Sequence, residues 1–196
     1  MLIVCEGEKS EPHYLEELRD YYGLNTANIE VDGKCGSSPM SVFNHARQRY
    51  EDLVYSGDAY DRVYCVIDKD KHIDYQQALD AITRTQPIGC FYAINSVPCF
   101  EYWVLLHFIY TTQPFHATGT KSVCDCVVDR LRQDFLPDYK KGEKGLFAQL
   151  LTQLEFAKAN AIRSLKEAER NHTDNPSTRI HELVDYLQNL LKPKRL

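Results

Sequence analysis

The chain has 196 residues, of which 43% are hydrophobic and 26% are charged, and its formal net charge is −5 at pH 7. This length suffices for one sizeable domain, and the composition excludes a disordered chain or a repeat array. The negative charge argues against a protein that holds nucleic acid by bulk positive charge alone. It leaves open an enzyme that reaches a phosphodiester through metal ions.

The sequence carries no signal for a membrane or for secretion. The longest apolar stretch, residues 102–110, is too short to span a bilayer, and residues 1–5 run directly into a polar turn. Seven cysteines occur without any Cys-x-x-Cys pair, which argues against a zinc site. We therefore expect a cytoplasmic protein with reduced thiols.

The first part of the chain alternates predicted strands with predicted helices. Strands are predicted over residues 2–5, 27–31, 62–67 and 89–94, where apolar and β-branched residues gather. Helices are predicted from residue 10, after a cap at Ser38 as far as about residue 53, and over 73–84 and 99–110. This alternation predicts a parallel four-stranded sheet with helices on both faces.

From residue 111 onward, the patterns are helical. Helices are predicted over residues 123–131, 145–169 and 177–191, with breaks at Pro137, Gly142 and Asn175-Pro176. We therefore expect an α/β core over residues 1–110 and a helical section over 111–196 that packs on this core.

Acidic residues follow two of the predicted strands. Glu6 comes directly after the first strand, and Asp68 and Asp70 come after the third. Open parallel sheets place their sites at the carboxyl ends of strands, so these three carboxylates would meet if the two strands are neighbours. In an extended backbone Asp68 and Asp70 point to the same side. Such oxygen ligands suit Mg²⁺ or Mn²⁺, although an Asp-x-Asp pair alone is more often a turn feature.

The same residues carry a resemblance to a known family. Val4-Cys-Glu-Gly-Glu-Lys-Ser-Glu11, followed by Val66-Ile-Asp-Lys-Asp-Lys-His72, resembles the TOPRIM fold of OLD-type nucleases and, within it, the RloB family. Further stretches that look RloB-like are residues 98–108, 139–142, 175–178 and 181–184. The resemblance spans nearly the whole chain and implies a TOPRIM-like fold.

The resemblance also implies roles for single residues. Glu6 matches the TOPRIM glutamate, which is assigned to acid–base work or metal binding, and Asp68 and Asp70 match the metal-binding pair. Glu11 matches a second acidic residue that would hold a second metal. RloB-like proteins are similar to components of phage-defence loci, where a neighbouring gene commonly encodes an AAA or ABC-type ATPase. Such an ATPase is therefore the expected partner.

Four more polar residues are candidates for the site. Glu101 begins an apolar helix, where a buried carboxylate needs a cation or another partner; a carboxylate stabilised by the helix dipole is the equal alternative. His72, Lys140 and Lys141 are candidate contacts for substrate or phosphate. For His72 a position on the solvated surface is an equal alternative. For Lys140 and Lys141 a solvated loop is the favoured interpretation.

Together with the acidic residues, the resemblance implies a Mg²⁺- or Mn²⁺-dependent nuclease subunit of an antiviral abortive-infection or restriction-linked system, which acts on DNA or RNA. Its catalytic residues would be Glu6, Asp68 and Asp70, and its metal ligands these three with Glu11 and Glu101. Two alternatives stay open: a catalytically silent sensor or adaptor with the same fold, and a nucleotidyl-transfer enzyme. A homo-oligomer is also open.

Overall fold

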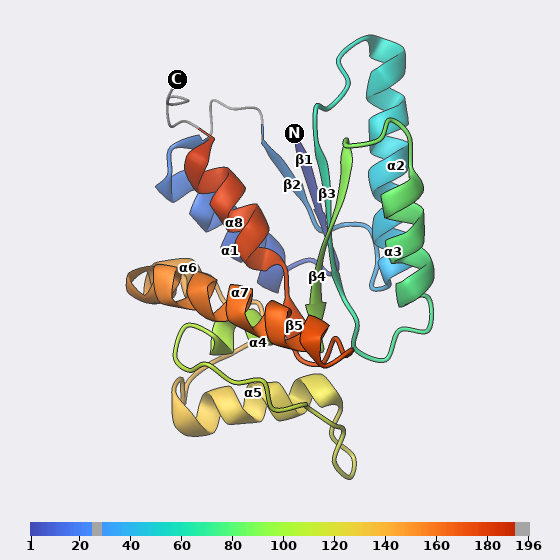
Figure 1. Ribbon diagram of the computed structural model, residues 1–196. Coiled ribbons are helices and arrows are strands. Elements are labelled where there is room, and N and C mark those ends of the chain that lie inside the picture. Colours follow the sequence, from blue (N-terminus) through green and yellow to red (C-terminus); the bar gives the residue numbers. More distant parts are fainter. Residues whose placement is uncertain (25–28, 191–196) are drawn as a thin grey trace.

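The computed structural model describes residues 1–24 and 29–190 and shows an α/β fold built on a five-stranded sheet (Figure 1). The strands are β1 (Leu2–Cys5), β2 (Glu30–Asp32), β3 (Val63–Asp68), β4 (Phe91–Val97) and β5 (Ser177–Thr178). They lie in the order β2-β1-β3-β4-β5. The first four are parallel, and β5 is antiparallel to β4.

Helices cover both faces of this sheet. They are α1 (Ser10–Tyr21), α2 (Pro39–Ser56), α3 (Tyr75–Arg84), α4 (Phe100–Leu105), α5 (Val123–Asp134), α6 (Leu146–Leu150), α7 (Leu154–Arg170) and α8 (Ile180–Asn189), with a turn of 3₁₀-helix, η2 (Leu151–Gln153). α2 and α3 pack on one face in one apolar cluster. α1, α8 and the helices from α4 to α7 share a larger cluster on the other face.

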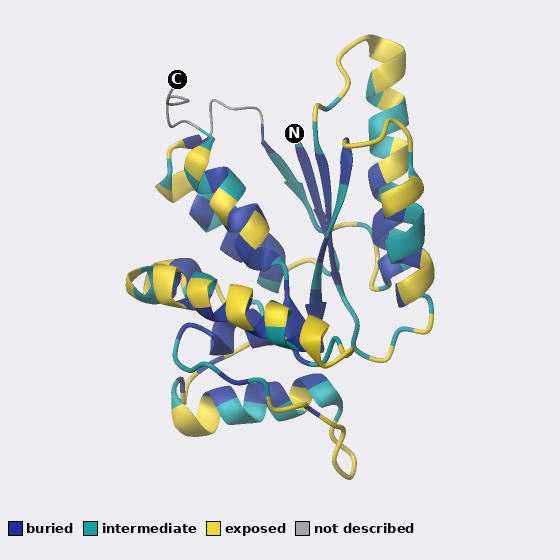
Figure 2. Cartoon of the chain, in the orientation of Figure 1, coloured by how far each residue is buried: buried dark blue, intermediate teal, exposed yellow. Residues whose placement is uncertain are grey.

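Burial on both faces explains the composition of the central strands. All four residues of β1 are fully buried, and the first five residues of β3 are buried as well. Figure 2 shows these strands in the buried colour, with the exposed residues on the outer sides of the helices. A strand covered from both sides needs an uninterrupted apolar run, which is the pattern that predicted it.

Local sequence signals set the start and end of α2. The Ser38 side chain accepts a hydrogen bond from the Ser41 N–H at 3.3 Å, and Pro39 occupies the first helical position. Gly57 ends the helix in the left-handed conformation, with φ of 80°. The cap predicted at Ser38 is confirmed.

The predicted parallel sheet with helices on both faces is confirmed, and three of the predicted helices differ clearly from the observed ones. The helix expected over residues 99–110 ends at Leu105, where the Asn160 side chain donates to the Leu106 carbonyl at 2.9 Å. The helix expected over 145–169 is broken into α6, η2 and α7. The helix expected from residue 177 starts at Ile180, because Ser177 and Thr178 pair with β4 as a fifth strand. Residues 27, 28 and 191 of the predicted elements lie outside the described residues.

Two further expectations concern the chain as a whole. All seven cysteines are free, and Cys5 and Cys65 are buried within their strands. Within the described ranges, no helix is both long and apolar enough to cross a membrane. The section after residue 110 packs on the sheet through the larger apolar cluster.

Candidate functional site

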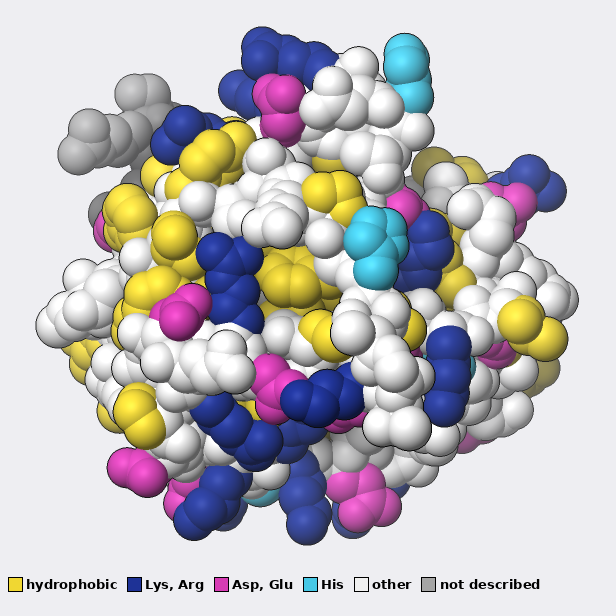
Figure 3. Space-filling view, turned by 90° about the horizontal axis from the view of Figure 1, so that it is seen from below, with side chains coloured by type: hydrophobic (Ala, Val, Ile, Leu, Met, Phe, Trp, Pro, Cys, Tyr) yellow, Lys and Arg dark blue, Asp and Glu magenta, His cyan; other side chains and the backbone are white. Residues whose placement is uncertain are grey.

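An acidic cavity of about 360 Å³ lies at the carboxyl ends of β1 and β3. Its lining residues are Glu6, Gly7, Glu8, Lys9, Ser10, Glu11, Asp68, Glu101, Lys141 and Gly142. Figure 3 looks at this end of the molecule and shows Lys and Arg side chains around a few acidic ones.

Four of the lining carboxylates come from positions that the topology brings together. β1 and β3 are neighbours, with Cys5 opposite Val66, so Glu6 and Asp68 leave the sheet at the same edge. Glu11 and Glu101 lie in the first turns of α1 and α4. Helix N-termini favour negative charge, which makes these two positions suitable for acidic residues.

Hydrogen bonds hold the two carboxylates at the strand ends. The backbone N–H of Asp68 donates to Glu6 Oε2 at 3.2 Å. The backbone N–H of Phe100 donates to Asp68 Oδ2 at 3.0 Å. The other oxygen of Glu6 lies 2.8 Å from His72 Nε2. The end of β3 and the start of α4 therefore fix the positions of Glu6 and Asp68.

Glu101 is held by a loop from the helical section. Its side chain is only 3% exposed, and Tyr139 Oη donates to Glu101 Oε1 at 3.2 Å. Lys141 Nζ lies 3.1 Å from Glu101 Oε2. The loop is anchored on α1, where His13 Nδ1 lies 3.0 Å from the Gly142 carbonyl oxygen. Residues from both parts of the chain thus complete the cavity.

Burial and mutual repulsion disfavour the ionised forms of these carboxylates. Burial, followed by the charge of Glu101, raises the pKa of Glu11 to about 8. Burial, followed by the charges of Glu11 and Glu101, raises the pKa of Asp68 well above its usual range. The pKa of Glu6 is also raised, chiefly by burial. Burial alone would lower the pKa of Lys141, yet its pKa is raised because Glu101 stabilises the ammonium.

The donor set fits a hard divalent cation. Carboxylate oxygens are the ligands that Mg²⁺ and Mn²⁺ prefer, and Glu11 forms no ion pair within the described part of the chain. In residues 1–24 and 29–190, no three Asp, Glu, His or Cys side chains form a ready metal cluster. Mg²⁺ is commonly held by one or two carboxylates together with several waters, so a preformed cluster is not required.

The remaining predicted residues lie at different distances from this cavity. His72 contacts Glu6, as described, and Lys141 lines the cavity. Lys140 faces a separate pocket of about 290 Å³ formed by residues of the 135–149 segment. The roles of these residues in binding stay predictions.

Asp70 departs from the geometry expected for it. The expectation of an extended backbone through Asp68 and Asp70 is wrong, because β3 ends at Asp68 and Asp70 has a φ of 30°. The Asp70 N–H donates to the Pro98 carbonyl at 2.9 Å, which turns the chain after the strand. Asp70 is not among the residues that line the cavity, although its charge acts on Glu6.

Sequence reasoning missed Tyr139 and Lys9. Tyr139 reaches Glu101 across 38 positions of sequence, and no local pattern indicates such a contact. Lys9 lines the cavity, and its side chain packs against Gly142 so closely that a Cβ there would lie 2.6 Å from Lys9 Cβ. The motif at residues 139–142, noted only as a point of resemblance, was the available signal for this loop.

Comparison with protein families finds a match over most of the chain. The family model of RloB-like proteins matches residues 1–187. No curated protein and no solved structure matches the chain. The matched range includes every residue of the acidic cavity, and it confirms the resemblance noted from the sequence motifs.

Proposed function

Because the chain belongs to the RloB-like family, we propose that it is a TOPRIM-type nuclease subunit that hydrolyses DNA or RNA phosphodiesters with Mg²⁺ or Mn²⁺. One observation carries this proposal: four carboxylates from two strand ends and two helix starts line a single cavity. A fold that only needed stability would gain little from collecting buried carboxylates with so few cations.

The residues of the cavity suit distinct tasks. Glu6 and Asp68 would hold a first ion, and Glu11 and Glu101 would hold a second, while Asp70 would join from the loop after β3. A bound divalent ion would supply charge for the phosphate and a more acidic water. Glu6, whose pKa is raised by burial, would accept or return a proton beside His72.

Basic residues next to the cavity would place the substrate. Lys141 lies at the cavity wall, and Lys140, the preceding residue of the loop, lines a separate pocket. Both would contact phosphate oxygens on either side of the bond that is cut. This arrangement would let a chain of net charge −5 bind nucleic acid locally.

We also propose the setting suggested by the family. The chain would act in the cytoplasm, in an antiviral abortive-infection or restriction-linked system, together with an AAA or ABC-type ATPase. Its seven free cysteines support a reducing compartment.

The test is cleavage of a panel of transfer RNA, single-stranded and duplex substrates with Mg²⁺ or Mn²⁺, with and without the ATPase. Asp68→Asn should reduce the cleavage rate by about a thousandfold or more, since it removes a charge that acts on the ion directly. Asp52→Asn, on the exposed side of α2, is the matched control and should cleave normally. Cleavage at the normal rate by Asp68→Asn would refute the proposed chemistry.

An adaptor without catalysis is the second candidate, and one observation favours it. Glu101 already has Lys141 as a counter-ion, and Glu6 already contacts His72. Calorimetric titration with Mn²⁺ separates the two functions. A nuclease should bind Mn²⁺ and lose this binding in Asp68→Asn, whereas an adaptor with an inactive site should give the same titration with and without the substitution. Product analysis with nucleoside triphosphates separates hydrolysis from nucleotidyl transfer.

A further inference from the structure

Lys9 is an unpaired cation at the wall of the acidic cavity. It lies in the turn between β1 and α1, immediately before Ser10, and it is exposed. The other cation in the lining is Lys141, whose ammonium lies 3.1 Å from Glu101. Within residues 1–24 and 29–190, the Lys9 side chain forms no ion pair.

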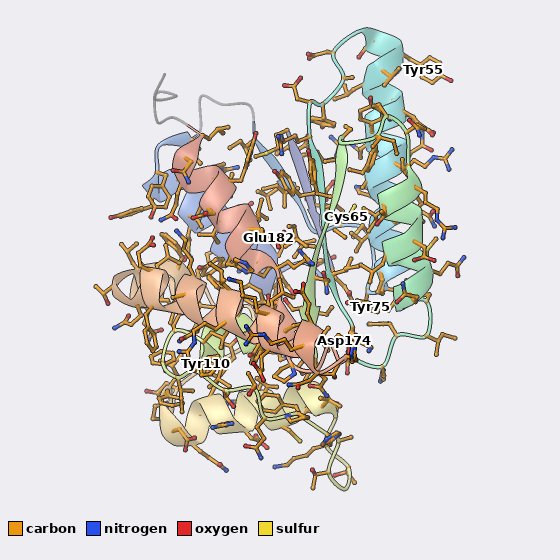
Figure 4. The ribbon with its side chains drawn as sticks, in the orientation of Figure 1. Tyr55, Cys65, Tyr75, Tyr110, Asp174 and Glu182 are labelled. Atoms are coloured by element: carbon orange, nitrogen blue, oxygen red, sulfur yellow. The ribbon has the colours of Figure 1, made fainter. Side chains whose placement is uncertain are left out.

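The lysine that follows β3 is engaged outside the cavity. Lys69 Nζ lies 2.6 Å from Asp174 Oδ2, and Lys69 is not among the residues that line the cavity. Figure 4 labels Asp174 beside the lower end of β4, at the edge of the sheet where the parallel strands end. Of the two lysines in the turns directly after β1 and β3, Lys9 is therefore the one whose ammonium is available to a ligand of the cavity.

The aliphatic part of the Lys9 side chain packs on the loop that carries Lys141. A Cβ on Gly142 would lie 2.6 Å from Lys9 Cβ and 3.1 Å from Lys9 Cδ, so this side chain runs along the Gly142 backbone. His13 contacts both residues: its N–H donates to the Lys9 carbonyl at 2.9 Å, and its Nδ1 lies 3.0 Å from the Gly142 carbonyl oxygen. A lysine held in this way loses less conformational freedom on binding a ligand than a fully mobile one.

The charges of the cavity indicate which ligand Lys9 would serve. A lysine whose task was to neutralise the lining carboxylates would be paired with one of them, as Lys141 is with Glu101. Five carboxylates line the cavity, so an anion can enter only when divalent cations neutralise them. Under that condition Lys9 remains an unpaired positive charge, and a lysine ammonium binds phosphate oxygens as a point charge.

We propose that the Lys9 ammonium binds a nonbridging oxygen of the phosphodiester that is cut and holds this phosphate in the acidic cavity. The inference rests on the proposed nuclease function and adds a substrate contact to the same site. Lys141 already has a carboxylate partner, and Lys140 lines a separate pocket, so these two lysines are placed for the phosphates on either side of that bond. Lys9 lines the cavity of the carboxylates and is placed for the phosphate between them.

The first test is the cleavage kinetics of the full chain, with its metal ion, on the substrate of the panel that the unmodified chain cuts fastest. Lys9→Met should lower kcat/KM about tenfold or more. The slope of log kcat/KM against log salt concentration should become shallower by about 0.7–0.9, because one phosphate contact is lost. Lys9→Arg keeps the charge and should keep the slope. Lys166→Met, on α7 and outside the cavity, is the matched control and should change neither quantity.

The outcomes separate this inference from the function on which it rests. If the unmodified chain cleaves and Lys9→Met keeps the same kcat/KM or the same salt slope, the role of Lys9 is overturned and the nuclease stands. No cleavage by the unmodified chain, with or without the ATPase, would reject the nuclease and this inference with it. Calorimetry gives a readout without activity: Lys9→Met should bind Mn²⁺ at least as tightly as the unmodified chain, because a positive charge is removed from the cavity. Weaker Mn²⁺ binding would show that Lys9 supports the structure of the site instead.

A second variant tests the packing that holds the lysine. Gly142→Ala places a methyl group against the Lys9 side chain and should lower kcat/KM about as much as Lys9→Met does. The double variant should be no worse than either single one, because both changes remove the same contact. Gly119→Ala is the control, since Gly119 also has a positive φ, 61°, but no neighbouring atom within 4 Å of its Cβ position. Losses that multiply in the double variant would show that Gly142 does not act through Lys9.

Discussion

Glu11 lies in the first turn of α1, 7% exposed, and burial together with the charge of Glu101 raises its pKa to about 8. The folded protein therefore holds the Glu11 proton over a pH range in which the unfolded chain, with a value near 4.5, releases it. Stability falls as the pH rises between these two values, because the unfolded state then binds fewer protons. Below that range the cost of Glu11 disappears, since both states are protonated.

Glu11→Gln should remove this cost. The unfolding free energy of the variant minus that of the unmodified chain should be about 2–4 kcal/mol larger at pH 8 than at pH 5, both measured in EDTA. Urea denaturation at both pH values measures it. Glu16→Gln, on the same helix outside the cavity, is the matched control and should show no such growth. A constant difference between the two pH values would show that folding does not raise the pKa of Glu11.

Single residues also show what the sequence could and could not predict about the site. The proximity of Glu6 and Asp68 was predictable because the ends of neighbouring parallel strands meet at one sheet edge. The hydrogen bond from the Asp68 N–H to Glu6 confirms it. The position of Asp70 was not predictable. The prediction assumed an extended strand through Asp68 and Asp70, whereas Asp70 has a positive φ that turns the chain. Tyr139 was not either, since its contact with Glu101 depends on how a distant loop packs.

At the scale of elements, the loop over residues 139–142 places the Lys141 ammonium against the Glu101 carboxylate at the wall of the cavity. Lys141→Met should destabilise the protein by about 1–3 kcal/mol at pH 7 in EDTA, because Glu101 is buried and loses its cation. The figure is below that of a fully buried pair because Lys141 is half exposed. Lys140→Met, next to it and outside the cavity, is the control. Equal stability of the two variants would show that Lys141 does not stabilise Glu101.

The turn after β1 depends on close packing with the loop after β2. A Cβ at Gly33 would overlap the Gly7 carbonyl oxygen and lie 2.8 Å from Pro12 Cγ. Gly33→Ala should therefore lower the unfolding free energy by about 1–3 kcal/mol and displace Glu6. Thermal denaturation with Lys34→Ala as the control measures the first effect. A normal melting temperature would show that the two loops can move apart without a loss of stability.

Whole elements were predicted well where burial leaves a strong pattern. The apolar runs of β1 and β3 identified both strands, and the sheet they form is parallel, as expected. β5 was missed because Ser177 and Thr178 carry no strand pattern, and only their pairing with Ser96 and Val97 makes them a strand. The break between α6 and α7 was missed because residues 145–169 keep a helical pattern throughout.

For the molecule as a whole, one apolar cluster joins residues from both predicted sections of the chain. Leu15 of α1 and Trp103 of α4 share it with Phe147 of α6 and Leu183 of α8. A fragment of residues 1–110 should therefore lack a cooperative unfolding transition and bind an apolar dye, since it would expose one side of its sheet. Circular dichroism on heating measures this. A sharp transition would show that residues 1–110 fold alone.

The Lys141–Glu101 contact has a consequence for the order in which the protein is made. Residues 6, 11, 68 and 101 leave the ribosome early, but the lysine that faces Glu101 and the strand that flanks β4 are translated much later. Chains fold from the N-terminus as they are synthesised. A nascent chain interrupted before residue 141 would carry these four carboxylates without the loop that completes the cavity. The proposed activity should thus arise only in molecules whose translation has passed well beyond the carboxylates themselves.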